Sequence, residues 1–339
     1  MRERNYTISA IRMICTISIV VLHIFQQYET IMPAIRVVTD WLNLGLVMFF
    51  CISAFLYSQR DITNVPKWLC RRYRELIIPS LVVGIMTLMI SFLSGHNDFY
   101  RIGEILLSCL GFQVWSNDSW LFVQLWFLTY ILFCYVSIPL IQKIPCKDCS
   151  ELKFWTLLIG LLVFAQIATY LLESILKIQL LSVGVLLRFY LPYFLLRRYD
   201  LNGKILRKVM CALSGIAIVA VFITCACRYT TLLPLPAPIK ELAFIYTQTL
   251  SGCVCFYWIY HGLSGVRIPR TLLDISDRYS YEVYLTHCLF IGYSTSVIRA
   301  FNYAAVGVCL ALLLTIVTSI GVQKLAHRIL KALNRNSNP

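Results

Sequence analysis

Charged residues are scarce in this chain, and their scarcity narrows the class of protein. Asp, Glu, Lys and Arg make up 14% of the 339 residues, whereas soluble domains contain about 25%. Hydrophobic residues reach 59%, against about 45–50% in an ordinary globular domain. Intrinsic disorder is excluded, because disordered chains are poor in apolar residues. A soluble globule would expose much of this apolar surface, so a chain dissolved in a lipid bilayer is the better prediction.

Long polar segments, internal repeats and low-complexity tracts are also absent from the sequence. The longest connection between apolar segments, residues 95–123, leaves no room for an appended soluble domain, so we expect a single domain over residues 1–339. Within that connection, Ile102–Trp115 is too short and interrupted to span, which predicts an interfacial or re-entrant helix. No cleavage site of small residues follows the first apolar segment, and we expect that segment to remain as a membrane helix.

Ten apolar segments are spaced along the chain. Most are close to the roughly 20 residues that a helix needs to cross the hydrocarbon core. An all-α integral membrane protein follows, because lipid forces backbone polar groups to be satisfied within each segment. The predicted spans, each placed to within a few residues, are 8–28, 38–58, 76–94, 124–141, 153–172, 180–196, 207–227, 241–260, 280–299 and 303–323. Ten spans would place both termini on the same side of the membrane.

The distribution of charge predicts which side that is. Lys and Arg number 30 against 16 Asp and Glu, and most of the basic residues fall in connections on the side of the termini. Because basic loops stay in the cytoplasm, both termini are predicted to be cytoplasmic, in a multi-pass protein of the cytoplasmic (inner) membrane. Nucleic acid is excluded as a partner, since no basic loop is long enough to form a domain and aromatics are not interleaved with the charges. The lipid bilayer is the expected partner, and the oligomeric state stays open.

The cysteines do not predict a metal site. Most of the 14 cysteines lie inside apolar spans, where cysteine behaves as a small hydrophobic residue. Cys146 and Cys149 form one CxxC motif in a predicted cytoplasmic loop. A structural zinc site needs four ligands, and neither a histidine nor a second CxxC lies nearby. We therefore expect no metal, and the role of this motif stays open.

Ionisable residues inside membrane spans are costly, so they are candidates for function. Arg12 and His23 lie eleven residues apart on the first predicted span. Eleven helical steps of about 100° return to within roughly 20° of the starting direction, with a rise of about 16 Å. Both side chains therefore lie on one stripe, with Arg12 nearer the cytoplasm. The alternative is that Arg12 reaches the interface and His23 bonds a neighbouring helix.

A second cationic stripe lies at the cytoplasmic mouth of the third span. Lys67, Arg71 and Arg74 fall at i, i+4 and i+7, so a helix would present them on one face. Such a stripe suits phosphate groups, through charge and bidentate guanidinium contacts. The alternative is a topological anchor on anionic lipid.

The ninth span carries a third group of polar residues. Ser280, Tyr284 and His287 share one helical face at i, i+4 and i+7, so His287 has potential hydrogen-bond partners on its own helix. A structural histidine is as consistent with this pattern as a catalytic one. Arg188 in the sixth span and Glu282 add buried charge whose partners the sequence does not identify.

Several short motifs along the chain carry a resemblance. They are Tyr6, Arg12 and His23; the run Phe49–Phe55; Arg71 and Arg74 before Pro79; Leu125–Leu128; and Ser280, Tyr281, Tyr284, Leu285 and His287. In this order they resemble the motifs of membrane acyltransferase family 3. That resemblance implies an integral-membrane enzyme that transfers acyl groups, usually acetyl, from acyl-coenzyme A to sugars and related acceptors of the cell envelope. Ala54 stands where the family usually has Gly, which removes a backbone freedom and adds a methyl group.

The resemblance and the polar residues together lead to a specific hypothesis. Coenzyme A enters from the cytoplasm, and its acyl group reaches a hydroxyl of an envelope carbohydrate within the membrane; no metal takes part. The expected site residues are His23 and His287 as catalytic groups; Arg12, Lys67, Arg71 and Arg74 for acyl-coenzyme A; and Trp126, Tyr284 and Arg188 in the acceptor cavity. Whether His23 acts as a general base or takes the acyl group itself stays open.

A multi-pass transporter of a small polar solute is the alternative from another class. Isolated Arg, His and Glu residues within spans also describe a carrier, in which His23 and Glu282 would relay protons. The sequence shows no inverted repeat and no matched pair of helices interrupted by Gly or Pro, which favours the enzyme. The identity of the acceptor and the length of the acyl chain cannot be predicted.

Overall fold

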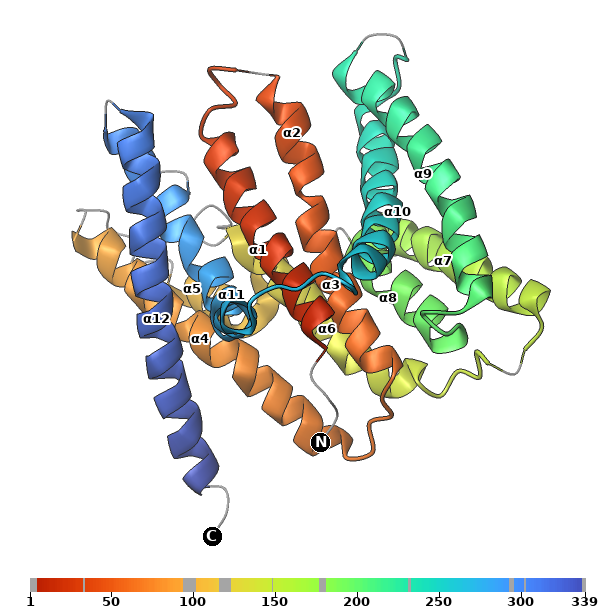
Figure 1. Cartoon of the computed structure of the whole chain (residues 1–339), viewed down its shortest axis with the longest axis horizontal. Helices are drawn as coiled ribbons and strands as arrows, with labels where there is room; N and C mark the ends of the chain where they lie inside the picture. Colours follow the sequence, from red (N-terminus) through yellow and green to blue (C-terminus); the bar gives the residue numbers. More distant parts are fainter. Residues whose placement is uncertain are drawn as a thin grey trace. The chain divides into compact units, whose positions relative to one another are not determined.

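The structure is a computed structural model that describes residues 5–32, 34–93, 102–115, 123–147, 149–176, 181–230, 233–292, 296–301 and 303–336. These residues form helices joined by short connections and contain no strand, which confirms the all-α prediction. Figure 1 shows the helices along the chain. The chain is organised in two compact units. Unit 1 comprises Met1–Cys15, Asn43–Thr63 and Cys134–Ile268, and unit 2 comprises Thr16–Leu42, Asn64–Phe133 and Pro269–Pro339.

Within the described residues, seven helical segments are long and apolar enough to cross a membrane. They are Tyr6–Gln26, Ile35–Ser58, Val65–Ile90, Glu151–Ile175, Lys204–Tyr229, Ala237–Leu263 and Ala304–Leu333. The apolar helix α6 (Trp126–Ile141) and the helix α8 (Val183–Arg198) have 16 residues each, which is shorter than the roughly 20 residues of a typical span. A multi-pass membrane protein is therefore supported, while the count of ten spans and the cytoplasmic termini stay predictions.

Two helices differ clearly from the predicted spans. Helix α4 (Val65–Leu93) begins well before the predicted span 76–94, because its basic first turns continue the helical hydrogen bonding of the apolar part. Helix α11 (Arg270–Ile291) begins earlier and ends earlier than the predicted span 280–299. It ends where the Gly292 amide donates to the Cys288 carbonyl. A Cβ on residue 292 would lie 2.4 Å from that oxygen, so the chain leaves the helix at a glycine.

The predicted interfacial segment 102–115 is a series of short helical pieces. They are α5 (Ile102–Leu107), the π turn η2 (Ser108–Phe112) and the 3-10 turn η3 (Gln113–Trp115). The Tyr73 hydroxyl of α4 donates to the Leu110 carbonyl at 3.3 Å. The segment is thus attached to α4, and no single piece of it is long enough to span.

Unit 1 is held together by close packing around α10 (Ala237–Leu263). This helix contacts α3 (Leu44–Ser58), α8 and α9 (Lys204–Tyr229), and α3 also packs on α8 (Figure 1). Gly252 of α10 faces Val47 of α3, and a Cβ at position 252 would lie 2.4 Å from the Val47 Cγ1 atom. The glycine lets the two backbones approach, as small residues do between membrane helices.

Replacing Gly252 with Ala is expected to destabilise unit 1 by about 1–3 kcal/mol, because the added methyl group overpacks the interface between α3 and α10. Thermal unfolding of the purified protein in detergent measures this loss. Gly215→Ala on α9 is the matched control, since nothing lies within 4 Å of a Cβ there. An unfolding midpoint of Gly252→Ala equal to that of Gly215→Ala would contradict the close packing.

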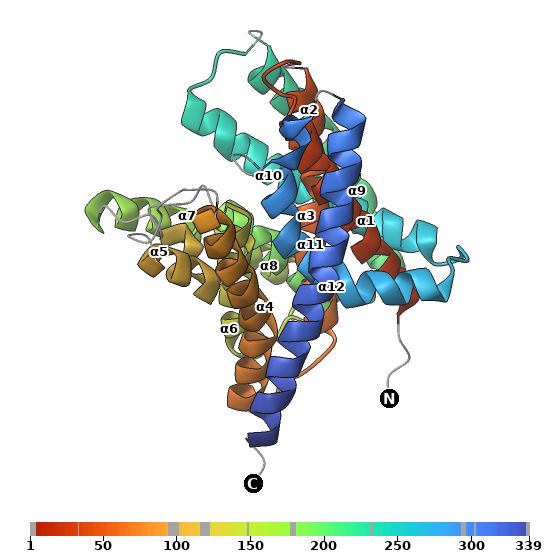
Figure 2. The same cartoon turned by 90° about the vertical axis from the view of Figure 1, so that its left-hand side faces the viewer.

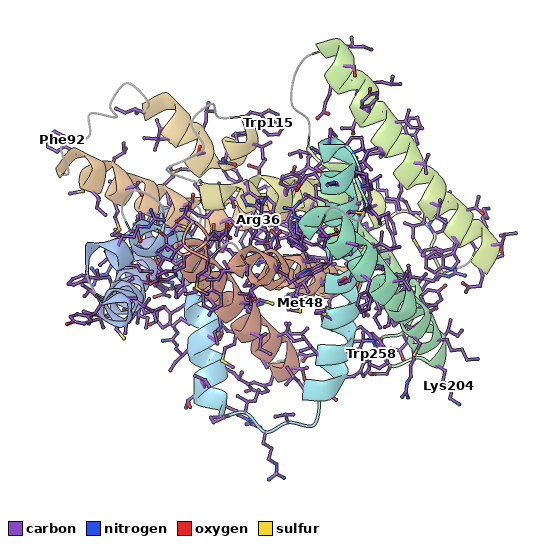
Figure 3. All side chains as sticks on the ribbon, turned by 90° about the horizontal axis from the view of Figure 1, so that it is seen from above. Arg36, Met48, Phe92, Trp115, Lys204 and Trp258 are labelled. Atoms are coloured by element: carbon purple, nitrogen blue, oxygen red, sulfur yellow. The ribbon has the colours of Figure 1, made fainter. Side chains whose placement is uncertain are left out.

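Two helices of unit 1 present apolar side chains along most of their length. On α7 (Glu151–Leu176) Phe164 is 70% exposed, and on α9 Phe222 is 72% exposed. Figure 3 shows side chains projecting outward along both helices. A soluble protein rarely exposes contiguous apolar surface of this kind. The pattern is typical of helices that face lipid, which supports a membrane protein.

In unit 2, α12 (Ala304–Asn336) packs along α4, α11 and the 3-10 turn η5 (Val297–Ala300) (Figures 1 and 2). The second half of α1 (Tyr6–Gln26) joins this group through a buried apolar cluster. The cluster consists of Val20 and Ile24 of α1, Ile291 of α11, Ile298 of η5 and Ala311 of α12. It fixes the end of α1 against the end of α11, and these two ends carry His23 and His287.

Candidate functional site

His23 and His287 form a pair in unit 2. Their ring centroids lie 4.9 Å apart, and the ring planes are tilted by 42°. His287 is 0% exposed, whereas His23 is half-buried. Two histidines from helices far apart in the sequence therefore meet beside the apolar cluster described above.

Hydrogen bonds define which nitrogen of each ring carries the proton. The Nδ1 atom of His23 lies 2.7 Å from Oε1 of Gln26, and that of His287 lies 3.1 Å from the carbonyl oxygen of Val283. Both oxygens only accept, so each Nδ1–H donates. In the neutral rings, Nε2 is then the unprotonated nitrogen of both histidines. An unprotonated imidazole nitrogen can act as a base, as a nucleophile or as a metal ligand.

Gln26 and Cys288 are two site residues that sequence analysis does not single out. Gln26 lies three residues after His23 on α1, a spacing that places two side chains on one helical face and could have identified it. The Sγ atom of Cys288 lies 3.3 Å from Nε2 of His287, and Cys288 is half-buried. No helical pattern indicates a contact between neighbouring residues, so the sequence could not show this one.

His23, His287 and Cys288 are also the group that could hold a metal ion within the described part of the chain. One donor atom from each lies within 4.8 Å of the other two. Three donors are one short of the four of a structural zinc site. The absence of a metal stays a prediction.

Tyr284 attaches the start of α6 to α11 beside the histidines. Its ring centroid lies 5.9 Å from that of His287 and 5.5 Å from that of Phe127. The Tyr284 hydroxyl donates to the backbone oxygen of Gln124, and Nε2 of Gln124 donates to the Leu285 carbonyl at 3.4 Å. These bonds hold the 3-10 turn η4 (Val123–Leu125) on α11.

Trp126, the predicted acceptor-cavity residue that follows η4, is the first residue of α6. It is half-buried, and its ring packs against Tyr130 with 5.6 Å between centroids. Tyr284 thus contacts the histidine pair directly, whereas Trp126 follows the turn that Tyr284 holds.

The predicted phosphate stripe lies on the first turns of α4. Helix α4 carries all three residues. Lys67 and Arg71 are exposed, and Arg74 is half-buried. Glu75 lies beside them, 2.6 Å from the Arg72 guanidinium and 3.9 Å from Nε of Arg71. The Arg71 side chain is 63% exposed, and an ion pair in that setting contributes little. Arg71 therefore stays accessible to a second anion.

Arg12 and Arg188 belong to unit 1 and not to the unit that holds the histidine pair. Arg12 is half-buried on the first half of α1. Arg188 is 3% exposed in α8 and donates to Oε1 of Gln248 on α10 at 3.1 Å. An amide oxygen is thus one partner of the buried charge whose partners the sequence did not identify. The roles predicted for both arginines rest on the sequence.

The CxxC motif has a structural explanation in unit 1. Arg198 donates to the backbone oxygens of Cys146 and Cys149, to the Cys149 sulfur at 3.3 Å, and to Oε1 of Glu151 at 2.8 Å. Both cysteines are free thiols. Burial raises the pKa of Cys146 above its usual value, which disfavours the reactive thiolate. The arginine organises this loop.

Comparison with known proteins agrees with the pattern of motifs. A family model described as an acyltransferase domain matches residues 5–323. The matched stretch includes the histidine pair, Gln26, Cys288 and the stripe on α4. Comparisons with curated proteins and with solved structures gave no match.

Proposed function

The chain belongs to acyltransferase family 3 and is a membrane acyltransferase, and on this premise we propose that it moves an acyl group from acyl-coenzyme A on the cytoplasmic side to a hydroxyl of an envelope carbohydrate. The acyl group we propose is acetyl, and the membrane is the cytoplasmic (inner) membrane. The single observation that carries the chemistry is the pair of His23 and His287 in unit 2, with an unprotonated Nε2 on each ring.

His23 acts on the acceptor hydroxyl in this proposal. Its Nε2 removes the proton as the oxygen attacks the thioester carbonyl, or attacks that carbonyl first to form an acyl-imidazole. Either way a C–O bond replaces the C–S bond, and coenzyme A leaves with the proton. Both routes need an unprotonated Nε2, which the bond from Nδ1 to Gln26 supports.

The stripe on α4 binds the phosphates of coenzyme A in the same proposal. Arg71 and Arg74 form charge-assisted hydrogen bonds to phosphate oxygens, and Lys67 adds a point charge. Arg12 precedes His23 by eleven residues on the continuous helix α1, a rise of about 16 Å. This length is comparable with an extended pantetheine arm, and we assign Arg12 to acyl-coenzyme A on the sequence pattern. No metal is needed for this chemistry.

The acceptor occupies the surroundings of Tyr284. The Tyr284 hydroxyl is bonded to Gln124, so this residue shapes the cavity rather than binding the acceptor through its hydroxyl. Trp126 offers a half-buried indole for contact with a sugar face. The role of Arg188 in binding the acceptor is proposed from the sequence alone.

The experiment that tests the proposed function is mass spectrometry of envelope glycans from cells with and without the protein. We expect acyl groups to disappear from one glycan when the protein is removed and to return when it is restored. Unchanged acylation of all envelope glycans would contradict the carbohydrate acceptor. Family membership favours the enzyme over the carrier.

Replacing Gln26 with Leu is expected to lower kcat for acyl transfer by about 10-fold without changing KM for the acyl donor, because the His23 ring loses the acceptor that fixes its tautomer. Steady-state kinetics on the purified protein measure the two constants. Gln26→Glu keeps an acceptor oxygen and should restore most of kcat. A change in KM alone would show that Gln26 does not position His23.

A further inference from the structure

Cys288 offers a nucleophile directly beside the proposed catalytic pair. Its Sγ atom lies 3.3 Å from Nε2 of His287, within the reach of a sulfur hydrogen bond. Nε2 is the unprotonated nitrogen of that ring, because Nδ1 donates to the Val283 carbonyl. A thiol, an imidazole and an oxygen that orients the imidazole are the three parts of an activated cysteine nucleophile.

The position of Cys288 allows it to meet a substrate. The side chain is half-buried, whereas His287 beside it is fully buried. The Sγ atom of Cys288 also lies within 4.8 Å of a ring nitrogen of His23. Cys51 is a useful contrast, since it is buried and its sulfur contacts the Arg188 carbonyl and Cys253. Cys288 therefore has a base beside its thiol and a partly exposed side chain, whereas a cysteine that only packs in the core has neither.

We propose that Cys288 carries the acyl group as a thioester between the donor and the acceptor. This inference rests on the proposed function, because it takes acyl-coenzyme A as the donor and gives the two histidines separate tasks. His287 activates Cys288, and His23 activates the acceptor hydroxyl.

Each half-reaction is balanced. In the first, the Cys288 proton moves to Nε2 of His287, and Sγ attacks the thioester carbonyl. The bond from the carbonyl carbon to the coenzyme A sulfur breaks, and the leaving thiolate takes the proton from His287. In the second, His23 takes the proton of the acceptor hydroxyl, whose oxygen attacks the Cys288 thioester. Cys288 leaves as a thiolate and takes up the proton that His23 removed, which restores both groups. No oxidant or further reactant is required.

The test is to trap the intermediate on the full-length protein. Purified protein is incubated with acetyl-coenzyme A that carries an isotopic label in the acetyl group, without acceptor, and is quenched in acid. We expect the wild-type protein to take up label that neutral hydroxylamine releases, as it does from thioesters, and peptide mass spectrometry to place the label on Cys288. Cys309→Ala, which removes an exposed cysteine of α12, should label like the wild type.

Variants separate Cys288 from the histidines as the site of the label. Cys288→Ala should take up no label, and Cys288→Ser should either take up none or form an ester that resists neutral hydroxylamine. His287→Ala should label at least about 100-fold more slowly, because it lacks the general base. His23→Ala should still label, since only the second step needs His23.

Three labelling results would overturn the inference. One is a wild-type protein that takes up no label, and another is a Cys288→Ala protein that labels like the wild type. The third is label that is lost in His23→Ala and kept in Cys288→Ala, which would place the acyl group on His23. A Cys288→Ala protein that releases coenzyme A at the wild-type rate in the presence of acceptor would refute the thioester and leave the proposed function standing. Absence of acceptor-dependent release in the wild type would instead refute the proposed function.

Discussion

Replacing His23 with Ala is expected to lower acyl transfer by about 10²- to 10⁴-fold, the contribution typical of a general acid or base. The same loss is expected if His23 takes the acyl group itself. The variant should still insert, because His23 is half-buried next to an apolar cluster that does not include its ring. Acylation of the envelope glycan in cells, normalised to the amount of protein in the membrane, measures the effect.

The control for this variant is His327→Ala, which removes an exposed histidine of α12. It should leave glycan acylation at the wild-type level. Wild-type acylation by the His23→Ala protein would remove His23 from the chemistry and would give its bond to Gln26 a purely structural role.

The second large effect is expected from replacing both Arg71 and Arg74 with Ala. A hydrogen bond to a charged group contributes about 1.5–3 kcal/mol, and about 1.4 kcal/mol corresponds to a tenfold change in affinity. The double variant should therefore bind acyl-coenzyme A at least about 100-fold more weakly. Equilibrium binding of acetyl-coenzyme A to the purified protein measures the loss, and added salt should weaken wild-type binding as well.

A matched control removes two positive charges elsewhere. Arg328 and Arg335 are exposed on the last turns of α12, and replacing both with Ala changes the net charge equally. Binding of acetyl-coenzyme A should stay at the wild-type level in that protein. If the Arg71 and Arg74 double variant also binds like the wild type, the stripe on α4 is a topological anchor only.

Hydropathy predicted the helical membrane fold but not the lengths of its helices. A window of apolar residues marks where lipid can lie, whereas a helix continues as long as its backbone hydrogen bonds do. The basic turns of α4 before residue 76 and the polar first turns of α11 are examples. The end of α11 depends on Gly292, a single small residue that an average over many positions does not detect.

The sequence could group candidate residues only where they share one helix. The helical period placed Arg12 and His23 on one stripe, and it grouped Lys67, Arg71 and Arg74. The pairing of His23 with His287 was not predictable, because it depends on how the apolar cluster packs α1 against α11.

The contact of Cys288 with His287 could not be predicted from the sequence, for another reason. The chain has fourteen free cysteines, and the sequence does not indicate which of them contacts an imidazole nitrogen. That contact depends on the rotamers of two neighbouring side chains, and sequence spacing does not determine rotamers.

The measurement that tests the central claim most directly is acceptor-dependent release of free coenzyme A from acetyl-coenzyme A by the protein in reconstituted vesicles. We predict that the wild type releases coenzyme A beyond one equivalent per protein only when an envelope glycan acceptor is present. The His23→Ala protein should release almost none beyond that first equivalent. Counterflow of a solute without acyl-coenzyme A, together with no acceptor-dependent release, would contradict the account and describe a carrier instead.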